Sequence, residues 1–162
     1  MEQAVPESKP KQQFTDPTAG PLLSVRFGVA LVLMAVGVAW ILYYYLGVRP
    51  DPTVFDDAGK AQAPGGPNFM GDLGEWNYLI GFGLFFLGLI TSAHPKTPLG
   101  RGRGVVVGMM GCFILGLLWI CTFYVISDDV SELAIFNDLG QKNLMVGIAF
   151  MAVGFTFATR WE

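Results

Sequence analysis

Residues 27–46 read FGVALVLMAVGVAWILYYYL, twenty positions without a single Asp, Glu, Lys, Arg or His. A helix rises about 1.5 Å per residue and the hydrocarbon core of a bilayer is about 30 Å thick, so a stretch of this length can cross it. Because hydrocarbon offers the backbone no hydrogen-bond partner, the stretch must pair its own N–H and C=O groups as a helix. It therefore predicts a transmembrane helix.

Three further runs share this character, at residues 76–93, 105–126 and 143–158. The chain of 162 residues is 52% hydrophobic and 14% charged, whereas soluble domains average about 25% charged residues. We predict an all-α membrane protein with four transmembrane helices, built as two tandem helix–loop–helix repeats. The expected segments are a flexible polar tail at 1–24, a first repeat at 25–94, a link at 95–104 and a second repeat at 105–162.

The basic residues predict which way the helices cross. Seven of the ten Lys and Arg residues precede the first run, follow the second run or close the chain, and three fall in the loops 47–75 and 127–142. Lys and Arg concentrate in cytoplasmic loops. We therefore expect both termini and the link in the cytoplasm, the two loops outside, and a multi-pass protein of the inner (plasma) membrane.

The order of helix, loop and helix occurs twice with related residues. GVAWI at 37–41 matches GLLWI 79 positions later, and FMGDLGEWN at 69–77 matches IFNDLGQKN 66 positions later. The difference leaves 13 extra residues in the first loop. They lie around residues 50–67, a stretch rich in Pro, Gly and Asp, which predicts an irregular insertion.

The shared Asp-Leu-Gly step predicts a turn that leads into the second helix of each repeat. Asp and Gly favour turns, and the Asn that follows can accept hydrogen bonds from the unpaired amides at a helix start. The residues assigned to this loop-to-helix turn are Asp72, Gly74, Trp76, Asn77, Asp138, Gly140 and Asn143.

Small residues recur at spacings that place them on one helix face. Gly81 and Gly88 are seven positions apart, as are Gly147 and Gly154, and such pairs let another helix approach closely. Two interpretations stay open, packing within the bundle and packing against a partner protein. The residues assigned to this packing or partner interface are Ala30, Gly37, Trp40, Gly81, Gly88, Gly104, Gly108, Gly116, Trp119, Gly147 and Gly154.

The composition argues against chemistry inside the membrane. None of the four runs holds an Asp, Glu, Lys, Arg or His, although proton and ion pathways usually need such a group at depth. One His and two Cys are too few for a haem pair, an iron–sulfur cluster or a structural zinc site. A net charge of -3 offers no basic excess for nucleic acid. We expect no catalytic residue, cofactor, metal, nucleic acid or small-molecule substrate.

The motif that opens the second run resembles a known family. DLGEWNYLIGFGL at 72–84, with GLIT at 88–91, resembles the second half of the actinobacterial CrgA family of small cell-division membrane proteins, and TRW at 159–161 is similar to that family's closing signature. The chain resembles two such units in tandem over about residues 24–161, with Lys142 in the second where the motif has Trp76. The resemblance implies an actinobacterial host and a non-enzymatic scaffold that recruits division and septal wall-synthesis proteins through its helices.

The predicted function is therefore contact with other integral membrane proteins in the lipid bilayer, as a scaffold or accessory subunit of a larger actinobacterial assembly. The resemblance points to cell division. An accessory subunit of a respiratory bcc–aa3 supercomplex fits the residues equally well, because such subunits are also small, apolar and free of cofactors. A small transporter or channel is the alternative from another class, and the lack of charge and of proline in the four runs argues against it.

Overall fold

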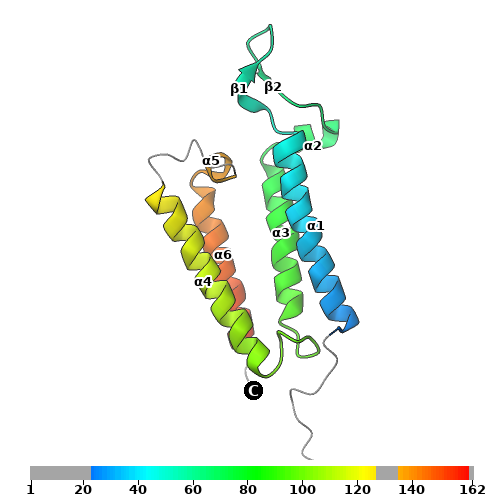
Figure 1. The fold of residues 1–162 in the computed structure, drawn as a ribbon, viewed down its shortest axis with the longest axis vertical. Coiled ribbons are helices and arrows are strands. Elements are labelled where there is room, and N and C mark those ends of the chain that lie inside the picture. Colours follow the sequence, from blue (N-terminus) through cyan, green and yellow to red (C-terminus); the bar gives the residue numbers. More distant parts are fainter. Residues whose placement is uncertain (1–22, 127–134, 161–162) are drawn as a thin grey trace, which may run out of the picture.

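Two helical hairpins form the body of the protein (Figure 1). The computed structural model describes residues 23–126 and 135–160. Helix α1 (Val25–Gly47) pairs with α3 (Trp76–Ser92), helix α4 (Arg103–Val125) pairs with α6 (Lys142–Ala158), and α3 contacts α6 between the hairpins. These four helices agree with the four predicted runs to within two residues at each end.

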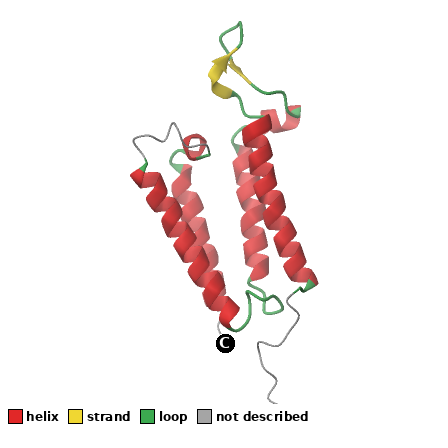
Figure 2. Cartoon of the chain, viewed as in Figure 1, coloured by secondary structure: helices red, strands yellow, loops and turns green. Residues whose placement is uncertain are grey.

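The four helices differ in length. Helices α1 and α4 have 23 residues each and are long and apolar enough to cross a membrane, whereas α3 and α6 are apolar but have 17 residues each. The hairpins are joined by residues 93–102, and we call this the link end of the molecule. The short helices α2 (Asn68–Leu73) and α5 (Phe136–Leu139) lie at the opposite end, which we call the junction end (Figure 2).

The insertion in the first loop is not irregular throughout, so this prediction was wrong in part. Strands β1 (Asp51–Phe55) and β2 (Ala61–Gln62) pair antiparallel beyond the junction end. The turn between them forms because the Asp56 carboxylate accepts hydrogen bonds from two amides that follow it, at 2.9 and 2.8 Å, and because Gly59 adopts a φ of 73°. The predicted tail at 1–24 lies almost wholly outside the described residues, as does the first half of the loop 127–142.

Glycines bring the backbones of α1 and α3 into contact. A Cβ atom placed on Gly37 would lie 2.5 Å from the carbonyl oxygen of Gly81 and 2.8 Å from the amide nitrogen of Phe85. A Cβ on Gly81 would collide with the Ile41 side chain, and one on Gly88 would lie 2.7 Å from the Ala30 carbonyl oxygen. Only glycine fits at these positions, so the small residues of this hairpin are used in packing α1 against α3.

The second hairpin repeats this packing at equivalent positions. A Cβ on Gly116 would lie 2.7 Å from the Gly147 carbonyl oxygen, and one on Gly147 would collide with Ile120, the counterpart of Ile41. Towards the link end, a Cβ on Gly108 would lie 2.5 Å from the Phe157 ring. The remaining assigned glycines pack less uniformly. A Cβ on Gly154 would lie 3.3 Å from Cys112 Cβ on α4, a tight contact without a collision, and one on Gly104 would collide with the Pro98 carbonyl in the link.

Aromatic side chains fill the space between the hairpins. The Phe150 ring on α6 packs against Phe85 and Phe86 on α3, with ring centroids 5.9 and 4.9 Å apart. Trp119 on α4 meets Phe82 edge to face at 5.8 Å. Trp40, its counterpart in the first repeat, lies 6.4 Å from Phe69 of α2. Hydrophobic rings thus form the contact between the two repeats along the helices, while small residues form the contacts inside each repeat.

We predict that Gly37→Ala and Gly116→Ala destabilise the hairpins by about 1–3 kcal/mol, the usual cost of overpacking a close contact. Matched controls exist on the same helices, because a Cβ on Gly28 or Gly111 meets nothing within 4 Å. Unfolding of the purified protein in mixed micelles with increasing SDS measures the loss. Equal stability of Gly37→Ala and Gly28→Ala would contradict the packing described here.

Candidate functional site at the junction of the hairpins

Each repeat turns into its second long helix through a glycine. Gly74 has a φ of 51° and Gly140 a φ of 47°, a region of backbone conformation that side chains bearing a Cβ rarely adopt. The two glycines immediately follow the short helices α2 and α5, so they let the chain reverse from each short helix into α3 or α6. The two glycines lie at equivalent positions of the two repeats.

The asparagines of the turn act in the opposite sense to the one expected. Asn77 is fully buried, and its Nδ2 donates to the carbonyl oxygens of Met70 and Gly74 at 2.7 and 2.8 Å. Asn143 makes the two equivalent bonds at 2.8 and 2.9 Å. Each side chain therefore ties a carbonyl of the short helix to the carbonyl of the turn glycine, and it donates to them where it was expected to accept from amides of the following helix.

The same polar atoms stay without a hydrogen-bond partner in both repeats. They are Asn77 Oδ1 and Trp40 Nε1 in the first repeat, and Asn143 Oδ1 and Trp119 Nε1 in the second, counted among the described residues. A buried unpaired polar group costs about 1–3 kcal/mol. Because the unpaired atoms are at equivalent positions, this free-energy cost is a property of the repeated hairpin and not of the contact between the two hairpins.

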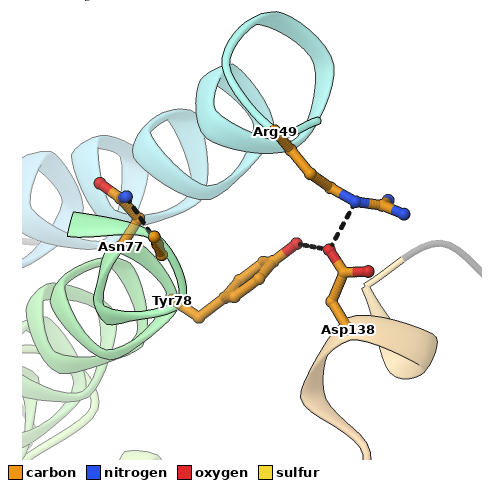
Figure 3. A network of polar contacts seen from close by, with 5 residues as sticks. Arg49, Asn77, Tyr78 and Asp138 are labelled. Atoms are coloured by element: carbon orange, nitrogen blue, oxygen red, sulfur yellow. Dashed lines mark hydrogen bonds and ion pairs between the residues drawn. The ribbon is translucent and has the colours of Figure 1, made fainter. Parts of the chain in front are cut away.

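Asp138 joins the two hairpins. Figure 3 shows its carboxylate, from α5 of the second repeat, between two donors of the first repeat. The Tyr78 hydroxyl donates to Asp138 Oδ2 at 2.6 Å, and Arg49 Nε lies 2.8 Å from the same oxygen. The side chains of Arg49 and Asp138 are each 15% exposed, so both charges are largely shielded from solvent. We call these three residues the polar junction.

Aromatic rings hold the donors of the polar junction in place. The Arg49 guanidinium lies over the Tyr45 ring, 4.7 Å from its centroid, which is a cation–π contact. The Tyr44 ring meets the Tyr78 ring edge to face at 5.2 Å. The three consecutive tyrosines at the end of α1 thus include two that support the polar junction.

A second ion pair crosses the same boundary at the surface. Lys142 Nζ pairs with Glu75 Oε2, and their side chains are 56% and 65% exposed. Exposed pairs contribute about 0–1 kcal/mol, so this contact stabilises the boundary little. Lys142 occupies the position that Trp76 has in the first repeat, and Trp76 itself is 66% exposed. Because the second repeat has Lys142 at this position, it forms an ion pair with Glu75 that two identical repeats would lack.

The polar junction is asymmetric although the repeats are related. The counterpart of Asp138 is Asp72, which is exposed, and the counterpart of Tyr78 is Leu144. Sequence reasoning assigned Asp138 to a turn and missed Arg49 and Tyr78 altogether. One difference between the repeats could have indicated this role: position 78 has a hydroxyl, whereas the equivalent position 144 has an apolar side chain.

The arrangement supports contact more directly than reaction. Arg49 neutralises the Asp138 carboxylate, Tyr78 donates a hydrogen bond to it, and both hairpins are joined at that point. Among the described residues, no group of three His, Cys, Asp or Glu side chains could hold a metal ion. The protein is thus a membrane protein made of two copies of one helical hairpin in a single chain. The copies differ in sequence where they contact each other.

Comparison with known proteins identifies the repeated unit. The model of the family described as cell division protein CrgA matches residues 2–96 and again residues 93–162. The chain belongs to this family, and the two matches agree with the tandem duplication seen in the sequence.

Curated CrgA proteins match about one repeat's length of the chain. The Streptomyces avermitilis protein is 36% identical over 64 residues, which are 40% of this chain and 71% of that protein. The Corynebacterium glutamicum protein is 42% identical over 62 residues, 38% of this chain and about half, 51%, of that protein. A Mycobacterium protein is 37% identical over 73 residues, 44% of this chain and 67% of that protein. No solved structure matches the chain.

We predict that Asp138→Asn and Tyr78→Phe each weaken the attachment of the hairpins, and that the two effects are not additive. A hydrogen bond to a charged group contributes about 1.5–3 kcal/mol, which is the coupling expected from the double-mutant cycle. The measurement is unfolding in mixed micelles, together with a spin-label distance between α1 and α4. Asp72→Asn is the matched control, and an equal effect of that variant would count against the junction.

Proposed function

We propose that this protein is a non-catalytic scaffold of bacterial cell division, which holds other integral membrane proteins together in the plasma membrane. The observation that carries the proposal is the double match to the CrgA cell division family, one match for each hairpin. The polar junction supports it, because Asp138 of one hairpin binds Tyr78 and Arg49 of the other, so these polar side chains serve contact between helical units. An actinobacterial host fits the relatives named above.

The proposed topology has four membrane crossings with both termini in the cytoplasm. Helices α3 and α6 are about 26 Å long at 1.5 Å per residue, near the short limit for a ~30 Å core. Each packs closely against a helix of 23 residues, so the short helices share the membrane depth of their partners. The link end carries the basic residues that favour the cytoplasmic side. The polar junction and the strand pair then lie on the outer side.

The partner surface follows from what the hairpins leave uncovered. The glycines at the centre of each hairpin are buried against the neighbouring helix, which places the partner surface on other residues. Large apolar side chains remain exposed along the outer faces of α1 and α4, where lipid or other transmembrane helices can pack. They include Val32, Val36, Leu42, Ile114, Leu117 and Leu118.

The topology yields a prediction that labelling of single cysteines can test. In a chain with Cys112 and Cys121 changed to Ala, we expect Ala58→Cys to react with a membrane-impermeant maleimide in intact cells. Lys96→Cys should react only after the membrane is permeabilised, because residue 96 lies in the link. Labelling of Lys96→Cys in intact cells would place the link outside and refute the topology.

The partners yield a second prediction. Purification of the tagged chain from its native host in mild detergent should recover division proteins of the septum in fixed ratio, and a fluorescent fusion should concentrate at the septum. Haem absorption bands in the purified material would instead indicate the respiratory supercomplex. Ion conductance by the purified chain alone in liposomes would indicate a channel. Either of these two results would overturn the division scaffold, and an unrelated four-helix membrane protein serves as the control.

A further inference from the structure

Positive charge converges at the link end from three separate parts of the chain. Arg26 lies just inside the start of α1, Lys96 in the link and Arg160 just after α6, and in Figure 1 these three segments lie at the same end of the molecule. The electrostatic environment of His94 in the link reflects all three charges. Its pKa is lowered first by burial and then by the charges of Arg26, Arg160 and Lys96, so all three lie within electrostatic range of one imidazole.

This basic cluster, Arg26, Lys96 and Arg160, has no acidic counterpart within the described part of the chain. The Arg49–Asp138 and Lys142–Glu75 ion pairs both lie at the junction end. All described acidic side chains also lie at that end or in the strand pair beyond it: Asp51, Asp56, Asp57, Asp72, Glu75 and Asp138. Cations held near one another repel, and an anion bound between them relieves that repulsion.

The link that carries Lys96 is a compact turn. Thr97 is fully buried, and its hydroxyl donates to the carbonyl oxygens of His94, at 2.7 Å, and Ser92, while Gly100 N donates to the Thr97 hydroxyl at 3.1 Å. A Cβ on Gly100 would collide with the His94 carbonyl. The turn therefore holds the backbone around Lys96 in one conformation, so less ordering is needed when a ligand binds.

The cluster lies where apolar surface begins. Leu23 is 79% exposed and Val25 is 86% exposed, and both are within three residues of Arg26. A ligand that fits this boundary has an anionic group for the cations and a hydrocarbon part for the apolar side chains. An anionic phospholipid has both. We propose that Arg26, Lys96 and Arg160 form a binding site for the headgroup of an anionic phospholipid, with its acyl chains against the start of α1.

Lipid selectivity in reconstituted membranes tests the site. The protein is placed in phosphatidylcholine vesicles that contain a trace of spin-labelled phosphatidylglycerol or spin-labelled phosphatidylcholine, and the protein-bound fraction of each label is measured by electron paramagnetic resonance. We expect the wild-type protein to bind the anionic label more strongly, and R26Q/K96Q/R160Q to lose that preference. Each cation near a membrane surface contributes up to about fivefold. Added salt should weaken the preference as well.

Matched variants separate the site from general effects of charge and folding. Lys60→Gln removes one lysine charge from the turn of the strand pair and should leave the preference unchanged, while Lys96→Gln should lower it. R26K/R160K keeps the charges and should retain the preference. An equal preference in wild type and the triple variant would overturn the proposal. So would displacement of the labelled lipid by inorganic phosphate beyond the effect of chloride at equal ionic strength, because that result indicates a site for the free ion. These outcomes do not depend on which division proteins the chain contacts.

Discussion

The close approach of two helix backbones, at Gly37 with Gly81 and at Gly116 with Gly147, is the contact on which the rest of the structure depends. Lipid tails are as apolar as leucine, so membrane helices are not driven together by a hydrophobic effect and rely on packing and hydrogen bonds. Glycines allow that packing along the centre of each hairpin. With each hairpin fixed in this way, the positions of the turns, the asparagines and the polar junction follow.

Charge divides the molecule along its length. Among the described residues, the acidic side chains and the polar junction lie at one end or in the strand pair beyond it, Arg26, Lys96 and Arg160 lie at the other end, and aromatic rings connect the hairpins between them. A charge at bilayer depth is costly, so each end concentrates the polar contacts that the middle lacks. The contact between the hairpins therefore depends on a few aromatic pairs at depth and on one well-shielded carboxylate at the end.

The helices were predictable because an uninterrupted apolar run has one structural solution in hydrocarbon, and their ends follow where polar residues begin. The repeat also predicted which glycines are equivalent. The strand pair was missed because Pro and Gly around residues 50–67 resemble a loop in composition, whereas the Asp56 turn depends on specific hydrogen bonds. The direction of the Asn77 bonds was missed because an amide carries donor and acceptor alike. Arg49 and Tyr78 gain their role only from Asp138, sixty residues beyond Tyr78.

The polar junction has a consequence for how an assembly could grow. Two separate copies of one hairpin, paired about a twofold axis, would have to present the same patch to each other. The fused chain is free of that restriction, since Tyr78 faces Asp138 while Leu144 and Asp72 stand at the reciprocal positions. One polypeptide therefore offers neighbours two non-identical sides in a fixed one-to-one ratio. A complex built on it acquires a direction within the plane of the membrane, which a symmetric pair could not provide.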